Sequence, residues 1–257
     1  MLLVTSREKR SNVHRRLSVA LATSSGDIEA AQRLRYRVFA GEMGARISGR
    51  APERDEDIFD AWCEHLIIRD DVADRVVGTY RILTPDRAQR FGAFYADGEF
   101  DLTCFRRVRP RAIEVGRACI DAEYRSGAAI MLLWQGLARY MSERNFDSLF
   151  GCASISLSDG GANAMRVYRH VAPRHLAPIE YRVFPRHRLG PREDADPDPS
   201  DATAVLPPLL KGYLRLGAWV GGEPAWDPDF NTADLFVILE LARMEARYAR
   251  HYLGPAA

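Results

Sequence analysis

This sequence of 257 residues has almost no lysine, few cysteines and no long apolar run. Its four cysteines lie far apart without paired spacing, which argues against a zinc site or a disulfide framework. The apolar run at 128–134 is much shorter than the ~20 residues that span a bilayer. With 36 basic and 35 acidic residues, the formal net charge is only +1. We therefore expect a cytoplasmic protein that binds no nucleic acid, and any membrane contact would be peripheral.

Lys9 and Lys211 are the only lysines, so nearly all the positive charge is arginine. A compositional bias of the source genome explains this better than selection for guanidinium chemistry. Arginine clusters are therefore weaker evidence of function. Residues 1–16 are basic and polar, which predicts a flexible arm that could touch anionic lipid. Residues 191–204 are acidic and interrupted by prolines, which predicts a loop within a domain.

The hydrophobic content of 47% is sufficient for a packed core, and the residue patterns alternate between strand and helix periods. Helix-start signals at Ser24 and Asp27 precede one amphipathic segment. We expect one α/β domain over residues 17–257, with a mixed, mostly antiparallel sheet flanked by helices. The predicted strands are 17–22, 63–69, 76–83, 113–120, 149–157 and 235–239, and the predicted helices are 28–42, 127–144, 162–171, 207–216 and 241–252.

The strand at 113–120 carries an ionisable pair, Glu114 and Arg117, around Gly116. On a straight strand the two side chains would face opposite sides and would be ordinary surface groups. Glycine inside a strand often marks a bulge, which would turn both toward one face. A helix with small first-turn residues follows, where free N–H groups can bind an anion. A carboxylate beside such an anion site suits acyl transfer from a phosphopantetheine thioester to an amine.

This order of strand, loop and helix resembles the pyrophosphate loop of the GNAT acyltransferase superfamily. Gly127 and Ala129 fit the loop pattern, whereas Tyr124 stands where the family has Arg or Gln and Arg125 follows one place late. The resemblance implies a GNAT-like fold, no metal and no permanently bound cofactor. It also implies that the thioester donor, on acyl carrier protein or CoA, binds at Arg125, Ser126, Gly127, Ala128 and Ala129.

A narrower resemblance covers roughly residues 35–240. Ordered motifs along this region are similar to those of the bacterial ornithine N-acyltransferases that make lyso-ornithine lipid, and several are shared with acyl-homoserine-lactone synthases. The motifs are Arg35-Tyr36-Arg37-Val38-Phe39, Glu42-Met43-Gly44-Ala45, Asp57-Ile58-Phe59-Asp60, Cys63-Glu64-His65-Leu66, Val77-Gly78-Thr79-Tyr80-Arg81, Glu114 to Cys119, Leu132-Leu133-Trp134, Phe150-Gly151-Cys152-Ala153-Ser154 and Leu206-Pro207-Pro208-Leu209-Leu210-Lys211-Gly212-Tyr213.

The resemblance implies a 3-hydroxyacyl donor on acyl carrier protein and ornithine as the acceptor. Glu114 is the expected base, acting directly or through a water, with Arg117 beside it. Asp57 and Asp60 could hold the cationic groups of ornithine, and Arg37 or Arg81 its carboxylate. Equally, Asp60, Arg37 and Arg81 could form an internal salt-bridge network. Carried over motif by motif, the substrate-binding candidates are Arg37, Phe39, Asp57, Asp60, Arg81 and Ser154.

Other candidate residues have an alternative structural explanation. Tyr168 could protonate the departing thiolate, or it could belong to the core. Cys152 and Ser154 could suggest a covalent intermediate, but no histidine is linked to them and direct attack on the thioester needs none. Arg106, Arg107, Arg109 and Arg111 could receive an acidic carrier protein, or they could lie on a solvated loop.

Three other functions stay open on the sequence. The nearest is acyl-homoserine-lactone synthesis, against which the segment 207–219 favours the lipid enzyme. The other two are a generic acetyl-CoA transferase and a non-catalytic module that binds acyl carriers. Ornithine also differs from lysine by a single methylene, which a pocket discriminates only weakly.

Overall fold

The computed structural model describes residues 16–47, 51–125, 127–189 and 203–244. Its centre is an eight-stranded sheet in the order β1-β2-β3-β5-β6-β10-β8, with β9 also paired to β10. All pairs are antiparallel except β5 and β6, which run parallel. The strands are β1 Leu17–Leu21, β2 Glu64–Asp70, β3 Arg75–Leu83, β5 Ala112–Ile120, β6 Ser148–Ser156, β8 Trp219–Val220, β9 Ala225–Asp227 and β10 Thr232–Glu240, and a separate small sheet pairs β4 Phe100–Asp101 with β7 Phe184–Pro185.

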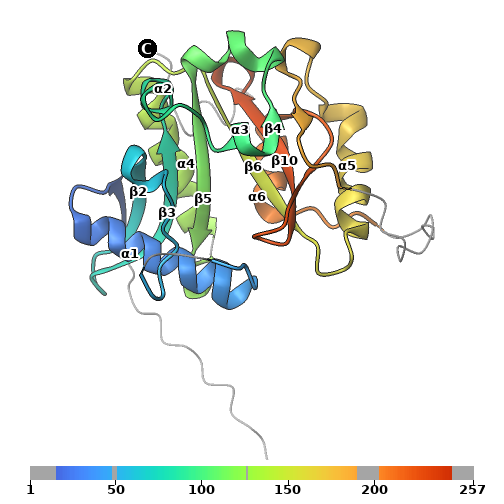
Figure 1. Cartoon of the computed structure of the whole chain (residues 1–257). Coiled ribbons are helices and arrows are strands. Elements are labelled where there is room, and N and C mark those ends of the chain that lie inside the picture. Colours follow the sequence, from blue (N-terminus) through green and yellow to red (C-terminus); the bar gives the residue numbers. More distant parts are fainter. Residues whose placement is uncertain (1–15, 48–50, 126, 190–202, 245–257) are drawn as a thin grey trace, which may run out of the picture.

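Helices cover both faces of the large sheet (Figure 1). Alternation along β2 separates the two faces, because Leu66 and Ile68 pack on the side of α4, α5 and α6, whereas Ile67 packs on the side of α1. The helix α1 begins at a capping box formed by Ser24 and Asp27 and continues into a π-helical turn at Arg37–Glu42. The helices are α1 Ser25–Tyr36, α2 Pro85–Phe91, α3 Ala96–Glu99, α4 Gly127–Glu143, α5 Ala162–His175 and α6 Pro208–Arg215.

The parallel strands β5 and β6 separate part of the way along the sheet. Their register pairs run only from Ala112↔Ser148 to Glu114↔Phe150, after which the strands diverge (Figure 1). At the point of separation, Gly151 lies against the backbone of β5, so close that an added Cβ would be 2.1 Å from the carbonyl oxygen of Val115. The separation opens a wedge in the middle of the sheet.

A β-bulge on β5 lies at the edge of this wedge. Thr79 pairs with Cys119 and Arg81 pairs with Gly116, so β5 has one more residue than β3 between these pairs. Arg117 takes the extra position with a left-handed φ of 53°. The predicted bulge and the shared face of Glu114 and Arg117 are confirmed, although Arg117 rather than Gly116 adopts the unusual conformation.

Most of the predicted elements are present, with shifts of a few residues at their ends. Between the predicted strands 76–83 and 113–120, where no helix or strand was predicted, the structure has α2, α3 and β4. The expected helix at 241–252 starts as a single 3₁₀ turn, Leu241–Arg243, and its remainder from 245 lies outside the described residues. Residues 1–15 of the predicted arm and 191–202 of the predicted loop also lie outside them.

Candidate active site

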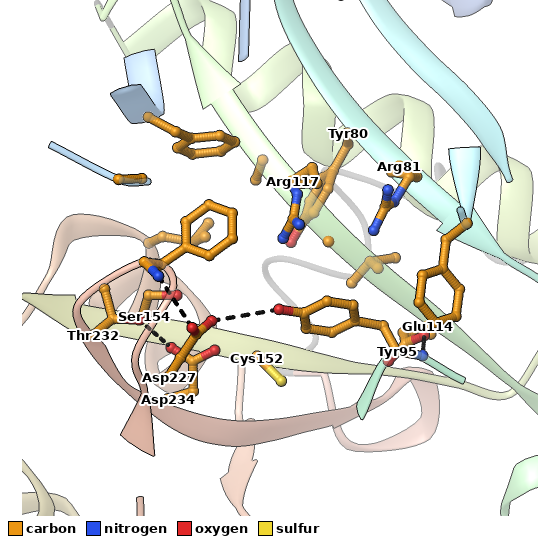
Figure 2. Close-up of a pocket in the computed structure, with 18 of the residues that line it drawn as sticks. Tyr80, Arg81, Tyr95, Glu114, Arg117, Cys152, Ser154, Asp227, Thr232 and Asp234 are labelled. Atoms are coloured by element: carbon orange, nitrogen blue, oxygen red, sulfur yellow. Dashed lines mark hydrogen bonds between the residues drawn. The ribbon is translucent and has the colours of Figure 1, made fainter. Parts of the chain in front are cut away.

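A cavity of about 260 Å³ occupies the wedge between β5 and β6. Its lining comes from both faces of the sheet, and the ends of α3, α6 and the β9–β10 turn close it. Figure 2 shows Arg81 and Arg117 on one side of the cavity, Asp227 and Asp234 on the other, and the ring of Tyr95 between them. The lining residues that the chemistry concerns are Phe39, Phe59, Tyr80, Arg81, Tyr95, Glu114, Arg117, Cys152, Ser154, Pro207, Pro208, Leu209, Asp227, Phe230, Thr232 and Asp234.

Glu114 is buried in the cavity wall and is held by backbone groups. Its two carboxylate oxygens accept hydrogen bonds from the backbone N–H groups of Tyr95 and Ala96, each at 2.7 Å. Burial raises the pKa of Glu114 to about 7, and the two N–H donors only partly oppose this. A carboxylate with a pKa near neutrality can both accept and return a proton at physiological pH.

Behind one wall of the cavity lies a buried ion-pair network centred on Arg35. The guanidinium of Arg35 is fully buried and donates to both oxygens of Asp60 at 2.8 Å and to Asp55 at 2.9 Å. Burial alone would raise the pKa of Asp60, but the hydrogen bonds and charge of Arg35 lower it below its usual range. Asp60 is therefore a structural anion that orders the segment after α1.

Arg81 and Arg117 connect this network to the cavity. Arg81 donates to Asp57 at 2.6 Å and to Asp60 at 3.3 Å, and Arg117 donates to Asp57 at 3.2 Å. The guanidinium of Arg117 also lies 4.4 Å above the ring of Phe230, whose face favours a cation. Asp57 thus bridges two arginines that face the cavity, and it is not itself part of the lining.

The opposite wall carries carboxylates. Asp227 accepts from the hydroxyl of Tyr95 at 3.4 Å, and Asp234 accepts from the hydroxyl of Thr232 at 3.0 Å (Figure 2). Burial, followed by the charge of Asp227, raises the pKa of Asp234 to about 6. Burial, followed by the charges of Asp234 and Asp227, likewise raises the pKa of nearby Glu99 to about 7. Burial and the neighbouring carboxylates together raise both values, and the charge of Arg117 opposes them only in part.

The structure does not bring all the predicted site residues together. Phe39, Arg81, Glu114, Arg117 and Ser154 line the cavity, and Asp57 and Asp60 support it from behind. Arg37 is half exposed and lies 3.7 Å from Asp121, outside the lining. Arg35 takes the position in the salt-bridge network that was predicted for Arg37. Arg35 also stands four residues after buried Ala31, but this spacing alone does not distinguish a buried ion pair from an arginine at the edge of the apolar side.

Two further predicted groups lie outside the cavity lining. Tyr168 is half buried and packs against the core on the face of the sheet that α4, α5 and α6 cover, as its structural alternative predicted. At the start of α4, Arg125 forms an ion pair with Glu42 at 2.6 Å and donates to the carbonyl of Ile120. Gly127 and Ala128 are exposed, Ala129 is buried in the core, and Ser126 lies outside the described residues.

The sequence interpretation missed Tyr95, Asp227 and Asp234 as site residues. No motif marks them: Tyr95 stands where no helix or strand was predicted, and Asp227 and Asp234 lie more than a hundred residues after Glu114. Cys152 also lines the cavity, and burial raises the pKa of its thiol well above its usual value, which disfavours the thiolate.

The described residues include no group of three or more His, Cys, Asp or Glu side chains that could hold a metal ion. None of the helices in the described part of the chain is long and apolar enough to span a membrane.

The splayed parallel strands, the bulge and the helix that follows them define a GNAT-type acyltransferase. Residues 34–135 match the family described as acetyltransferase (GNAT) domain. The fold is similar to that of the AHL synthase LasI, with a TM-score of 0.54 at 14% identity over 95% of this chain and 97% of that one. It is also similar to FeeM, an N-acyl amino acid synthase from uncultured soil microbes, with a TM-score of 0.53 at 13% identity over 93% and 99%.

One relative identifies the family. The L-ornithine N(alpha)-acyltransferase of Brucella abortus (strain 2308) is 38% identical over 251 residues, which cover 92% of this chain and 88% of the relative. The chain belongs to the L-ornithine N(alpha)-acyltransferase family, and it is an acyltransferase.

Proposed function

We propose that this enzyme transfers a 3-hydroxyacyl chain from the phosphopantetheine thioester of acyl carrier protein to the α-amine of L-ornithine, which yields lyso-ornithine lipid. The name of the relative supports the acceptor, and the shape and charge of the cavity support it independently. The cavity lies in the wedge between β5 and β6, with arginines on one wall and carboxylates on the other.

The carboxylate wall is the observation that carries the acceptor. Asp227 and Asp234 are both less than 5% exposed, and among the described residues neither they nor Glu99 form an ion pair with a lysine, arginine or histidine. Buried carboxylates without a counter-ion are costly, and a cationic ligand offsets this cost. Ornithine differs from most amino acids by its side-chain ammonium, which fits this wall, while its α-carboxylate would face Arg81 or Arg117.

Glu114 then supplies the acid–base chemistry. The α-ammonium becomes nucleophilic when it loses a proton to Glu114, directly or through a water. After Glu114 has passed this first proton to water, the amine nitrogen attacks the thioester carbon and gives a second proton to Glu114. The amide bond forms, and the C–S bond breaks as the thiolate departs. Protonated Glu114 can return the proton to the thiolate, so this route requires no role for Tyr168.

The donor would approach by the start of α4. Gly127 and Ala128 are exposed there, and no atom would contact a Cβ added at Gly127, so a phosphate group has open access to the first-turn N–H groups. Acyl-CoA carries the same pantetheine arm and is the alternative donor. The acyl product is amphiphilic, so we place the enzyme in the cytoplasm, in peripheral contact with anionic inner membrane.

The test incubates purified protein with 3-hydroxyacyl carrier protein, or the matching acyl-CoA, and a panel of amino acids that includes ornithine, lysine and glutamine. Mass spectrometry then detects the amide. We expect N-acylornithine as the main product. Addition of S-adenosylmethionine to the panel detects the acyl-homoserine-lactone reaction. The proposal is wrong if ornithine is not acylated while another acceptor is, or if no acceptor is acylated from either donor.

A further inference from the structure

A second concave site lies between α5 and α6. It encloses about 200 Å³, and its apolar floor is formed by Val171, Leu206 and Leu214. The side chains around it are basic, and the lining includes no acidic residue. We call this site the basic groove, and its basic residues are His170, Arg174, His175, Lys211 and Arg215.

The basic residues of the groove form two facing rows. On α5, His170 and Arg174 are four residues apart, as are Lys211 and Arg215 on α6, so each pair lies on one side of its helix. Within the part of the chain that the structure describes, none of the five basic side chains forms an ion pair. The arginine bias of the composition does not account for this pattern, because Lys211 is one of only two lysines.

The groove shares α6 with the reaction cavity. Pro207, Pro208 and Leu209, at the start of the helix, line the cavity, while Lys211 and Arg215 line the groove. On its other side α6 is held to the rest of the fold, because Tyr213 packs against Trp134 of α4 and its hydroxyl bonds that of Tyr80. Figure 1 shows α6 between α4 and α5. A ligand beside Lys211 would therefore lie within about one turn of α6 from residues that line the cavity.

An apolar side chain projects near the groove. Val205, next to the floor residue Leu206, is 70% exposed. Both backbone groups of Val205 are bonded to the side-chain amide of Asn163, at 2.9 and 3.0 Å, which keeps this segment against α5. Basic side chains around an apolar floor, with an exposed apolar side chain beside them, match the interface of an anionic bilayer, where phosphates lie above acyl chains.

We propose that the basic groove binds the phosphate of an anionic phospholipid and holds the enzyme at the membrane with α6 toward the bilayer. The charges of the two rows complement a phosphate diester, and the floor accommodates the adjoining apolar part of the lipid. The proposal draws on the proposed function in one respect: an acylated amino acid formed beside α6 would leave directly into the bilayer.

The test is co-sedimentation of the full chain with vesicles of phosphatidylcholine alone or mixed with phosphatidylglycerol. We expect binding only to the mixed vesicles. Removing two charges in the double variant Lys211→Gln/Arg215→Gln should lower the partition coefficient roughly 10- to 30-fold. The control, Arg106→Gln/Arg107→Gln, removes two exposed arginines outside the groove and should bind as the unaltered protein does.

The outcomes separate this proposal from its competitors. It is overturned if the unaltered protein ignores anionic vesicles, if the groove variant binds them normally, or if both variants lose binding equally. Acyl transfer from soluble acyl carrier protein, measured without vesicles, should be unchanged in the groove variant. A raised KM for the carrier with normal vesicle binding would assign the groove to the carrier instead. Vesicle binding needs no substrate, so its result does not depend on the proposed reaction.

Discussion

Replacing Asp234 by asparagine tests how the cavity recognises its acceptor. The substitution keeps the size and the hydrogen bond from Thr232 but removes the charge. The pKa of Asp234 is about 6 against an ordinary value of 3.8, so ionising it without a cation beside it costs on the order of 3 kcal/mol. An ammonium bound against Asp234 offsets up to this amount, which corresponds to roughly 100-fold in binding.

The assay compares kcat/KM for ornithine with kcat/KM for norvaline, which has the same carbon chain without the δ-amine. In Asp234→Asn we expect the preference for ornithine to fall roughly 10- to 100-fold, the smaller value if Asp227 retains part of the interaction. Because the pKa of Asp234 is raised, the acid is protonated below about pH 6. The preference in the unaltered enzyme should therefore increase as pH rises through 6, and the variant should lose this dependence.

A matched control is Asp229→Asn, since Asp229 is an exposed neighbour that does not line the cavity. It should leave the preference unchanged. Equal loss of activity toward both amino acids in Asp234→Asn would show a general structural effect and would contradict the assigned role, as would an unchanged preference. Thermal unfolding of each variant checks that the fold is retained.

Three further predictions concern the base, the buried network and the sheet wedge. In Glu114→Gln we expect kcat to fall roughly 10²- to 10⁴-fold. In the unaltered enzyme kcat/KM should increase as pH rises through about 7, where Glu114 loses its proton, and the variant should lose this increase. Undiminished turnover would exclude Glu114 as the base. Arg35→Met should lower the free energy of unfolding by about 3–5 kcal/mol because it leaves the buried carboxylates of Asp55 and Asp60 unpaired. Arg37→Met, at a half-exposed position, should change it little, and equal effects of the two substitutions in thermal melts would refute the central role of Arg35 in the network. Gly151→Ala should lower the free energy of unfolding by about 1–3 kcal/mol or more, since its Cβ would lie 2.1 Å from the carbonyl oxygen of Val115. The control is Gly98→Ala, whose Cβ would have no atom near it, and a Gly151→Ala protein of undiminished stability would show that the wedge can adjust.

Part of the site could be predicted because its signals are local. Gly116 between Glu114 and Arg117 is a local sign of a bulge, and the structure has that bulge. The choice between Arg35 and Arg37 depended on which side of α1 faces the sheet. A helical pattern in the sequence does not fix this side precisely enough to separate two arginines that stand two residues apart. Only packing buries Arg35 and leaves Arg37 facing Asp121.

The sequence by itself determined the order of most helices and strands, the bulged strand with its acid and arginine, and a set of ordered motifs that indicated the family. These features depend on spacing between near neighbours along the chain. Only the tertiary structure decided that Asp227 and Asp234 face the cavity that Glu114 lines, because the order of strands in the sheet brings β10 beside β6. Electrostatic coupling among buried groups depends on distance in space, and no local pattern in the sequence encodes that distance.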